Sequence, residues 1–501
     1  MKKNVLKLNI VAALFLQVVT MISGFIIPKI TLSYFGSSVN GLVSSINQFL
    51  NYITLLEGGV GSVIMSILYR PLYEKDQKRV SKIINTTSKF FRVIGTIYIG
   101  YVVLLSIIYP KYIASDFSKE FIITLIWVLA CNTFFQYFLS ITYRLLLNAD
   151  KKVAFVSFVQ AFAVILNIIC VVAFTIKFRN IVITKAISAA VFLIQPILYR
   201  IYVKKEYKID SEDGIDEFTQ SHRWDGLGIN TAYFIHSNTD IIILTIFTSL
   251  TDVSIYAIYL LIVNALKNLI ESISTALTPS FGSVLASGNS KQANEFFDAY
   301  ELIVCLITTI CFTCGMILVT PFVDVYTMNI HDANYHQVLF GILLMISEMI
   351  YCYRDPYVSA SYAAGHIKQV SKYAYVEAGI NIVLSVILVR RFGLIGVAIG
   401  TCISMAYRML MQVNYLKSNI LNRPWHIFAK LLLINIISAV ISTVVSFKFI
   451  DLHVLNYFQW LIVAVKVFLI VVSSEILLLF LFDRKDLSLL LDKLREKEKN
   501  K

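Results

Sequence analysis

Charged side chains are scarce in this sequence, at 15% of its 501 residues, whereas apolar residues make up 57%. Soluble domains contain about 45 to 50% apolar residues, and the mean hydropathy here is +0.73. Water is therefore not the main solvent of this fold. The patterns GxxxxGK[ST], HExxH and GxSxG are absent, which argues against ATP hydrolysis and against the metalloprotease and serine-hydrolase mechanisms. We expect a protein that is not an enzyme.

Cysteine is also rare, with seven residues, most of them within apolar runs. Such thiols behave as small buried hydrophobes, so the pattern favours neither a disulfide framework nor a metal site. The formal net charge of +13 comes from residues scattered over short loops, and no basic and aromatic domain is present. We therefore expect no nucleic-acid partner and interpret the positive charge as a signal of membrane topology.

What the sequence has instead is about fourteen long apolar runs, each near the roughly 20 residues that cross a bilayer as a helix. Continuous runs exclude a transmembrane barrel, whose strands alternate. We predict an all-α polytopic membrane protein whose helices cover residues 8–34, 40–68, 90–109, 119–143, 153–176, 181–202, 224–249, 253–282, 297–322, 336–362, 371–389, 394–416, 426–447 and 456–482. The first run continues without a signal-peptidase cleavage pattern, so we count it as a span.

Basic residues collect in every second loop. With a cytoplasmic N-terminus, the inner loops contain groups such as Lys75, Lys151 and Lys204, whereas the outer loops around Phe35 and Ser249 contain no Lys or Arg. Cytoplasmic loops of membrane proteins carry this excess of positive charge. The pattern predicts that both termini are cytoplasmic.

The chain divides into five predicted parts: a six-helix bundle over 1–202, a cytoplasmic linker over 203–223, a second six-helix bundle over 224–418, two additional helices within 419–482, and a charged tail over 483–501. The halves look related, because residues 148–152 lead into a run that contains Asn167, and residues 364–368 lead into one that contains Asn381. Such a repeat is typical of transporters. We expect the additional helix pair to lie outside the transport path.

Ionisable residues inside the runs are functional candidates, since each costs about 3 kcal/mol or more at the bilayer centre. In the eighth run, Asn264, Lys267 and Glu271 lie on one helical stripe, and the last two are i,i+4 neighbours that partly neutralise each other. Lys267 either faces an anionic ligand from the wall of a wet cavity or belongs to a structural ion pair between helices.

Two further basic residues are candidates for an anionic head group. Arg354 in the tenth run has the planar fork that suits phosphate, and a salt bridge with its neighbour Asp355 or with Glu348 is the alternative. Lys29, near the outer end of the first run, either lines a cavity or anchors its helix by snorkelling to the interface.

Several carboxylates and amides complete the set of candidates. The second run offers Asn47 and Asn51 with Glu57 beside them, and the seventh offers Asp240. Glu57, Asp240 and Glu271 are candidates for coupling to a proton or sodium gradient, because a buried carboxyl can exchange a proton near the working pH. Helix-to-helix hydrogen bonding is the alternative role, and we expect no bound cofactor.

Short segments rich in glycine and aliphatic residues recur at fixed places over roughly residues 1–420: YFG at 34–36, NGL at 40–42, LEGGVG at 56–61, DIIIL at 240–244, VSIY at 253–256, LTP at 277–279 and FGLIGVAIGT at 392–401. Together they resemble the polysaccharide-flippase branch of the multidrug/oligosaccharidyl-lipid/polysaccharide exporter superfamily. That family often has Asp where Glu57 stands, which is a conservative departure.

The resemblance implies a multi-pass protein of the bacterial cytoplasmic membrane that serves surface polysaccharide biosynthesis. It would move an undecaprenyl-diphosphate-linked oligosaccharide from the cytoplasmic to the outer leaflet by alternating access between two bundles. Its partners would be the lipid-linked glycan, membrane lipid, a polysaccharide polymerase and assembly proteins. A cationic cavity is also implied, with the diphosphate held by Lys267, Arg354 and Lys29.

Two alternatives within the same class stay open, a lipid-linked peptidoglycan precursor flippase and a cation-coupled multidrug exporter. A membrane-embedded polymerase or glycosyltransferase would normally carry a large outer loop with polar catalytic residues. The predicted outer loops are too short for that.

Overall fold

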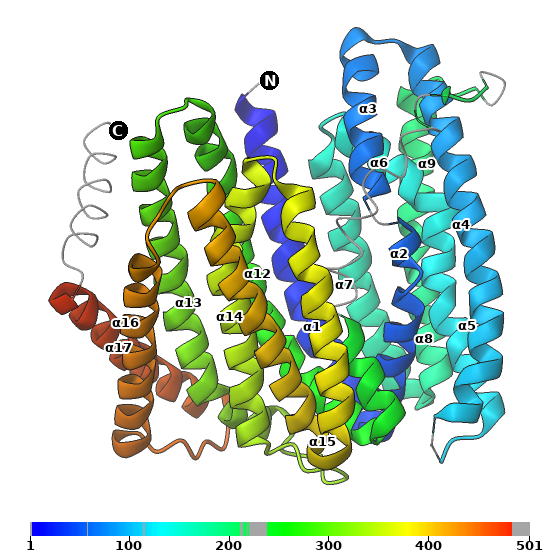
Figure 1. Cartoon of the computed structure of the whole chain (residues 1–501). Coiled ribbons are helices and arrows are strands. Elements are labelled where there is room, and N and C mark those ends of the chain that lie inside the picture. Colours follow the sequence, from blue (N-terminus) through cyan, green and yellow to red (C-terminus); the bar gives the residue numbers. More distant parts are fainter. Residues whose placement is uncertain are drawn as a thin grey trace. The chain divides into compact units, whose positions relative to one another are not determined.

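The computed structural model describes residues 3–57, 59–113, 116–210, 214–217, 219 and 238–482, and its regular elements are all helices. The predicted tail 483–501, part of the linker and the start of the seventh run lie outside the described residues. The helices are α1 (Lys3–Asn51), α2 (Thr54–Glu57), α3 (Val60–Glu74), α4 (Gln77–Tyr112), α5 (Lys119–Phe135), the π-helix η1 (Gln136–Ser140), α6 (Ile141–Ala149), α7 (Val153–Phe178), α8 (Ile181–Phe192), α9 (Ile194–Glu206), α12 (Leu250–Ala286), α13 (Ser290–Tyr326), α14 (Val338–Ala363), α15 (Ile367–Asn419), α16 (Trp425–Phe449) and α17 (Tyr457–Phe482) (Figure 1). The predicted all-α class is confirmed for these residues.

Within the described part of the chain, ten helical segments are long and apolar enough to cross a membrane. Helix α14 has 26 residues but carries Glu348, Arg354 and Asp355 in its interior and is not one of the ten. The count of fourteen spans and the cytoplasmic placement of both termini stay predictions.

Two helices are interrupted by glycine. Helix α1 has 49 residues and α15 has 53, more than twice the roughly 20 that one span needs. Gly36 in α1 has φ 82° and ψ 175°, and Gly393 in α15 has φ 55° and ψ −129°. These conformations favour glycine and divide each helix where the sequence analysis places a gap between two runs.

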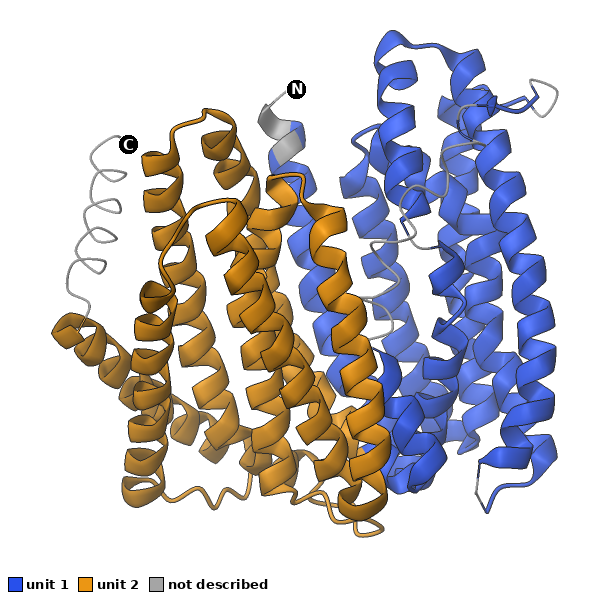
Figure 2. Cartoon of the chain, viewed as in Figure 1, with its two compact units in different colours: residues 1–254 blue, residues 255–501 orange. Residues whose placement is uncertain are grey.

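The chain forms two compact units, residues 1–254 and 255–501 (Figure 2). In unit 1, α1 packs along α7, and α5 packs against α4 and α8. The interior of this unit is a continuous cluster of buried apolar side chains that includes Leu42, Ile46, Phe91 and Leu146. The five-part division drawn from the sequence stays a prediction.

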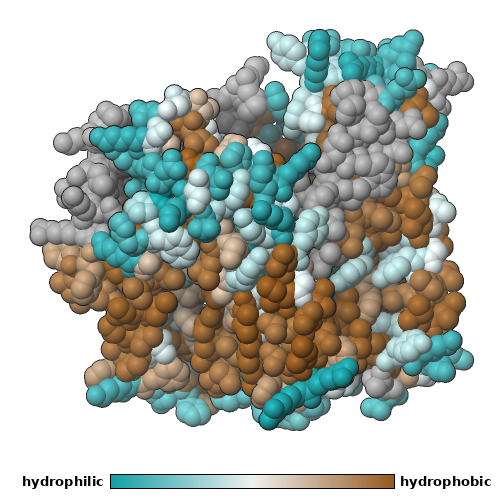
Figure 3. Space-filling view, viewed as in Figure 1, coloured by the Kyte–Doolittle hydropathy of each residue, from teal (hydrophilic) through white to brown (hydrophobic). Residues whose placement is uncertain are grey.

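In unit 2, α14 packs on α13 and α15, while α16 and α17 pack on each other and on α13. Val463, Val467 and Val471 of α17 are buried against Ile317 and Leu318 of α13. Apolar side chains also cover the outside, and on the visible face they form a band between hydrophilic ends (Figure 3). An apolar outer band of this kind suits a hydrocarbon solvent.

The crossing of α1 and the start of α12 inside unit 1 depends on one glycine. A Cβ atom at Gly41 would lie 1.7 Å from the carbonyl oxygen of Leu250, whereas a Cβ at Gly24 of the same helix would meet nothing within 4 Å. Backbone atoms cannot move aside as a flexible side chain can, so the two helices must separate if Gly41 gains a side chain.

We therefore expect Gly41→Ala to destabilise the protein by about 1 to 3 kcal/mol or more, the cost of overpacking. Gly24→Ala is the matched control and should leave the thermal unfolding temperature in detergent unchanged or slightly raised. Equal unfolding temperatures for the two variants would contradict the close packing of α1 on Leu250.

Candidate functional site

A cluster of charged side chains lies inside unit 2, and we call it the Tyr351 cluster. Its members come from three helices: Lys267 and Glu271 from α12, Glu348, Tyr351, Arg354 and Asp355 from α14, and Glu377 and Arg408 from α15. The structure thus brings together residues of two runs that the sequence analysis treated apart: Lys267 and Glu271 of the eighth run, and Arg354 and Asp355 of the tenth.

Lys267 is only 7% exposed. Its Nζ atom lies 3.1 Å from Glu348 Oε2 and 3.8 Å from the centre of the Tyr351 ring. The Tyr351 hydroxyl donates a hydrogen bond of 2.8 Å to Glu271 Oε1. In the described contacts, Lys267 therefore pairs with Glu348 on the facing helix. Glu271, the i,i+4 neighbour of Lys267, is hydrogen-bonded to Tyr351 instead.

Arg354 is 3% exposed, and its guanidinium carbon lies 4.6 Å from the centre of the Tyr351 ring. Its Nη1 atom donates to Glu377 Oε1 at 2.8 Å, and Arg408 Nη1 donates to the other oxygen of the same carboxylate. Glu377, at 0% exposure, therefore joins two buried arginines. Sequence reasoning missed Glu377 and Arg408, although each is an ionisable residue inside an apolar run, which by itself marks a candidate.

The charges of the Tyr351 cluster nearly balance. Lys267, Arg354 and Arg408 are three basic groups, and Glu271, Glu348, Asp355 and Glu377 are four acidic ones. Asp355 is half-buried near Ser274 and Glu271, while Asn264 is exposed on α12. An anion that enters this cluster must therefore compete with carboxylates that already hold the basic groups.

A second ion cluster fastens the segment between α15 and α16. Arg423 Nη2 lies 2.8 Å from Asp298 Oδ1 and also pairs with Glu301, both on α13, and Tyr357 of α14 donates to Glu301. Burial is the largest single influence and disfavours the charge of Arg423, but Glu301, Tyr357 and Asp298 together outweigh it, so the pKa of the guanidinium is raised. This cluster fixes the start of α16 against α13.

Unit 1 contains a polar cavity of about 410 Å³, lined by Asn47, Leu50, Asn51, Thr54, Glu57, Leu129, Asn132, Thr133, Gln136 and Tyr137. Three predicted residues, Asn47, Asn51 and Glu57, thus share one wall. The Tyr137 hydroxyl donates to Glu57 Oε2 at 3.3 Å. Gln136 and Tyr137 belong to η1, a π-helix inside the predicted fourth span; such bulges rotate the side chains that follow and are frequent at functional sites.

The other predicted residues of unit 1 lie apart from this cavity. Asp240 is buried and interacts electrostatically with Tyr52 of the segment that follows α1. Lys29 is half-buried in the middle of α1. Neither side chain belongs to the cavity lining.

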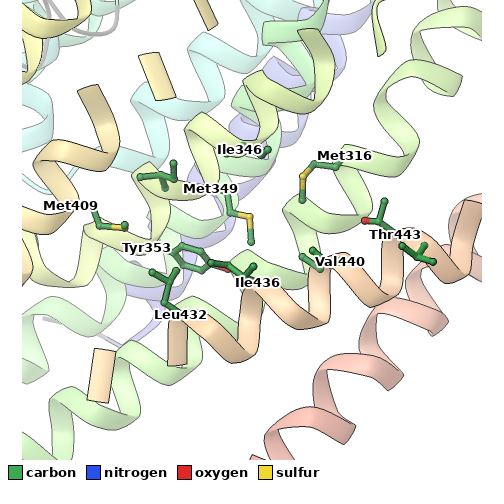
Figure 4. A pocket seen from close by; sticks show the side chains of 12 residues that line it. Met316, Ile346, Met349, Tyr353, Met409, Leu432, Ile436, Val440 and Thr443 are labelled. Carbon is green, nitrogen blue, oxygen red and sulfur yellow. The ribbon is translucent and has the colours of Figure 1, made fainter. Parts of the chain in front are cut away.

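Unit 2 also contains an apolar pocket of about 440 Å³, shown in Figure 4. Its lining comes from α13, α14, α15 and α16: Met316, Ile346, Met349, Ile350, Tyr353, Met409, Leu432, Ile436, Ala439, Val440, Thr443 and Val444. Three flexible methionines allow such a pocket to adapt to the shape of a ligand. Helix α16, one of the two additional helices, supplies half of the wall.

No metal site is apparent in the described residues, which contain no group of three or more His, Cys, Asp or Glu side chains able to hold an ion. The seven cysteines are free, including Cys311 and Cys314, which have the Cys-x-x-Cys spacing on α13. That spacing is an i,i+3 pair within one apolar helix.

No protein-family model and no curated protein matches the sequence, whereas several solved structures match the fold. The lipid II flippase MurJ in an inward closed conformation is similar over 94% of this chain and 99% of its own, with a TM-score of 0.69 and 17% identity. An inward-facing multidrug resistance MATE family transporter of the MOP superfamily matches 79% of this chain and 95% of its own, with a TM-score of 0.67 and 14% identity. The MATE multidrug transporter DinF-BH matches 85% of this chain and 97% of its own, with a TM-score of 0.62 and 15% identity. The chain has the fold of these transporters.

The Glu377 bridge yields a stability prediction. Glu377→Gln leaves two buried guanidinium groups without their shared counter-charge, and breaking a buried ion pair by removing one partner costs about 3 to 5 kcal/mol. We expect a large drop in the unfolding temperature in detergent.

Glu74→Gln is the matched control, because Glu74 forms an exposed i,i+4 pair with Arg70 at 2.8 Å. Exposed pairs contribute little, so this variant should unfold as the wild type does. A Glu377→Gln protein as stable as the Glu74→Gln protein would contradict the bridging role of Glu377.

Proposed function

We propose that this protein is a flippase that moves an undecaprenyl-diphosphate-linked oligosaccharide from the cytoplasmic to the outer leaflet by alternating access. The observation that carries the proposal is the two-sided character of α14. Met349 and Tyr353 line the apolar pocket, while Tyr351 and Arg354 belong to the charged cluster. A lipid with a charged head group and a long apolar chain has both chemistries next to each other.

In this proposal the diphosphate binds Lys267. The amine is held by Glu348 across 3.1 Å, so the phosphate oxygens must displace that carboxylate. Exchange of one anion for another at a buried amine avoids the cost of leaving the charge unpaired. It also makes binding reversible, which a carrier requires, because Glu348 can recapture Lys267 when the lipid leaves. Arg354 acts less directly, since Glu377 occupies its guanidinium.

The apolar pocket would hold part of the isoprenoid chain, which places α16 beside the transport path, contrary to the expectation from the sequence that the additional helices lie outside it. Its volume of about 440 Å³ is in the range of small-molecule sites and takes only a segment of such a chain, so the rest stays in lipid. In unit 1, the amide and hydroxyl groups around the 410 Å³ cavity match the hydrogen-bonding needs of sugar hydroxyls. This cavity is our candidate for glycan contact.

The structural neighbours include both a flippase and multidrug transporters, so their fold is compatible with either function. The neighbour named as a lipid II flippase matches 94% of this chain, against 79% and 85% for the multidrug transporters. Its name also supports a lipid-linked peptidoglycan precursor as an alternative substrate. A multidrug exporter is the second candidate function, because four carboxylates in the Tyr351 cluster would attract a cationic drug.

The exchange of Glu348 for phosphate predicts opposite effects of two substitutions. Lys267→Met removes the charged donor, and a charge-assisted hydrogen bond contributes about 1.5 to 3 kcal/mol, so we expect binding of the lipid diphosphate to weaken about tenfold or more. Glu348→Gln removes the competing anion, so binding should tighten while turnover slows. Lys466→Met, at an exposed lysine of α17, is the control.

The measurement is leaflet translocation and binding of a fluorescent undecaprenyl-diphosphate oligosaccharide in proteoliposomes. The same vesicles are tested with a lipid-linked peptidoglycan precursor and with a cationic dye. If the protein prefers the lipid-linked peptidoglycan precursor, that precursor replaces the oligosaccharide as the proposed substrate. Transport of the dye alone would favour a multidrug exporter. Unchanged binding in Lys267→Met, with the fold intact, would remove Lys267 from the site.

A second prediction concerns the apolar pocket. Val440 of α16 lines it and is 57% exposed, whereas Leu433 of the same helix is 58% exposed and lies outside the lining. Val440→Trp should fill the pocket and lower translocation severalfold, and Leu433→Trp should not. Equal activities of the two variants in the vesicle assay would exclude the pocket from the transport path.

A further inference from the structure

One buried face of α16 is polar, and it is adjacent to the face that lines the apolar pocket. Asn435, Ser438, Ser442 and Ser446 recur along this face at helical spacing, and all four are at most 1% exposed. Such a row can simply be an interface of small residues. What distinguishes this one is the residue that faces it from α17.

Glu475 lies on the buried face of α17, which otherwise carries Val463, Val467, Val471 and two leucines. Its side chain is 0% exposed. With the Asn435 amide oriented so that both of its ends have compatible partners, the amide nitrogen donates to Glu475 Oε1 at 3.0 Å. The hydroxyl of Ser438 lies close enough to interact with the Glu475 carboxyl, although Glu475 Oε2 has no partner in ideal hydrogen-bond geometry. A carboxyl group therefore points into the serine row.

Other buried hydroxyls of α13 and α16 also lack a hydrogen-bond partner in ideal geometry. The buried oxygens without a hydrogen-bond partner include those of Ser438, Ser442 and Ser446 on α16 and of Thr308 and Thr313 on α13. An ionised carboxylate can only accept hydrogen bonds, whereas a protonated one also donates. A Ser hydroxyl both donates and accepts, so the row can accept a hydrogen bond from a protonated Glu475.

No basic side chain in the described part of the chain forms a salt bridge with Glu475. The titratable groups that interact with it are Cys305 of α13 and Tyr353 of α14, both of which are neutral in their protonated forms. Arg423, which also interacts with Cys305, is paired with Asp298 and Glu301. Helices α13 and α16 pack on α17, and their charged groups lie toward the helix ends. On α16 these are His426, Lys430 and Lys448, and on α13 they are Lys291, Glu295, Asp298, Glu301 and Asp324. Lys466 of α17 is on the exposed side of that helix.

We propose that Glu475 is a proton-binding site: the bundle of α13, α16 and α17 holds it as a neutral carboxylic acid. A proton from the bulk solvent adds to the carboxylate to form one O–H bond, and this bond donates to a hydroxyl oxygen of the serine row. The charge that would be most costly in this environment is thereby removed. The reverse step returns the proton to water and leaves an uncompensated carboxylate between the helices.

The position of this site links it to the apolar pocket. Tyr353 lines the pocket, its hydroxyl lies 2.8 Å from Thr309 Oγ1, and it interacts with Asn435. Asn435 in turn holds Glu475. Loss of the proton therefore acts on α16 and on Tyr353, which are both part of the pocket wall. Proton binding at Glu475 is independent of the substrate, because it involves only a proton and the packing of α16.

The first test is infrared spectroscopy of the full-length protein in detergent, in H₂O and in D₂O. We expect a protonated-carboxyl C=O band that is absent from Glu475→Gln and retained in Glu74→Gln, whose carboxylate is exposed. If Glu475→Gln does not fold, Asn435→Ala serves instead, because loss of the amide donor must shift the band. A spectrum unchanged by the folded variant would overturn the proposal.

The second test is the pH dependence of unfolding. A native state that holds a proton which the unfolded chain releases loses stability as the pH rises. Between about pH 5 and about pH 9, the unfolding temperature of the wild type should fall relative to that of Glu475→Gln, and Glu74→Gln should follow the wild type. Parallel curves for all three proteins, or a dependence on sodium concentration in place of pH, would refute proton binding at Glu475.

Discussion

Hydrocarbon offers no partner to a charged or hydrogen-bonding side chain, so each ionisable group inside this protein must be satisfied by the chain itself. The interior of unit 2 follows from that constraint. Glu377 sits between Arg354 and Arg408, Glu348 faces Lys267, and the ring of Tyr351 lies against both Lys267 and Arg354. These contacts determine how α12, α14 and α15 are rotated, because each helix must direct its charges inward while its apolar side faces lipid or other helices.

Helix α14 shows how the same constraint can produce a function. It carries too many charges to resemble an ordinary apolar span, and it is stable because its charged side meets α12 and α15 while its other side lines an apolar pocket. A helix built this way places the two halves of an amphipathic lipid on its two sides. A phosphate that replaces Glu348 at Lys267 keeps the buried amine paired, while the displaced carboxylate stays beside it and can return.

Sequence alone was informative where the signal is local. Run lengths predicted the helices, and the gaps between runs coincide with the breaks at Gly36 and Gly393. Helical spacing placed Asn47 and Asn51 on one face with Glu57 beside them, and all three line one cavity. The sequence could not predict which residues pair between helices, because periodicity shows the helix face on which a residue lies but not which residue of another helix it contacts. Arg354 was therefore matched with Asp355 or Glu348, whereas its partner Glu377 lies 23 residues further on, in another helix.

The carboxyl groups inside this chain differ in the partners that compensate their charge, and the one on α17 faces α16 instead of a basic side chain. Glu377 has two arginines, while Glu57 and Glu271, which are half-buried, each accept a hydrogen bond from a tyrosine. Glu475 has the Asn435 amide and the Ser438 hydroxyl beside it, but no basic side chain of the described residues forms a salt bridge with it. An acid held by arginine keeps its charge, and one that lacks any cation is stable only when neutral. A helix pair that served solely as a membrane anchor would need neither this acid nor the serine row that faces it.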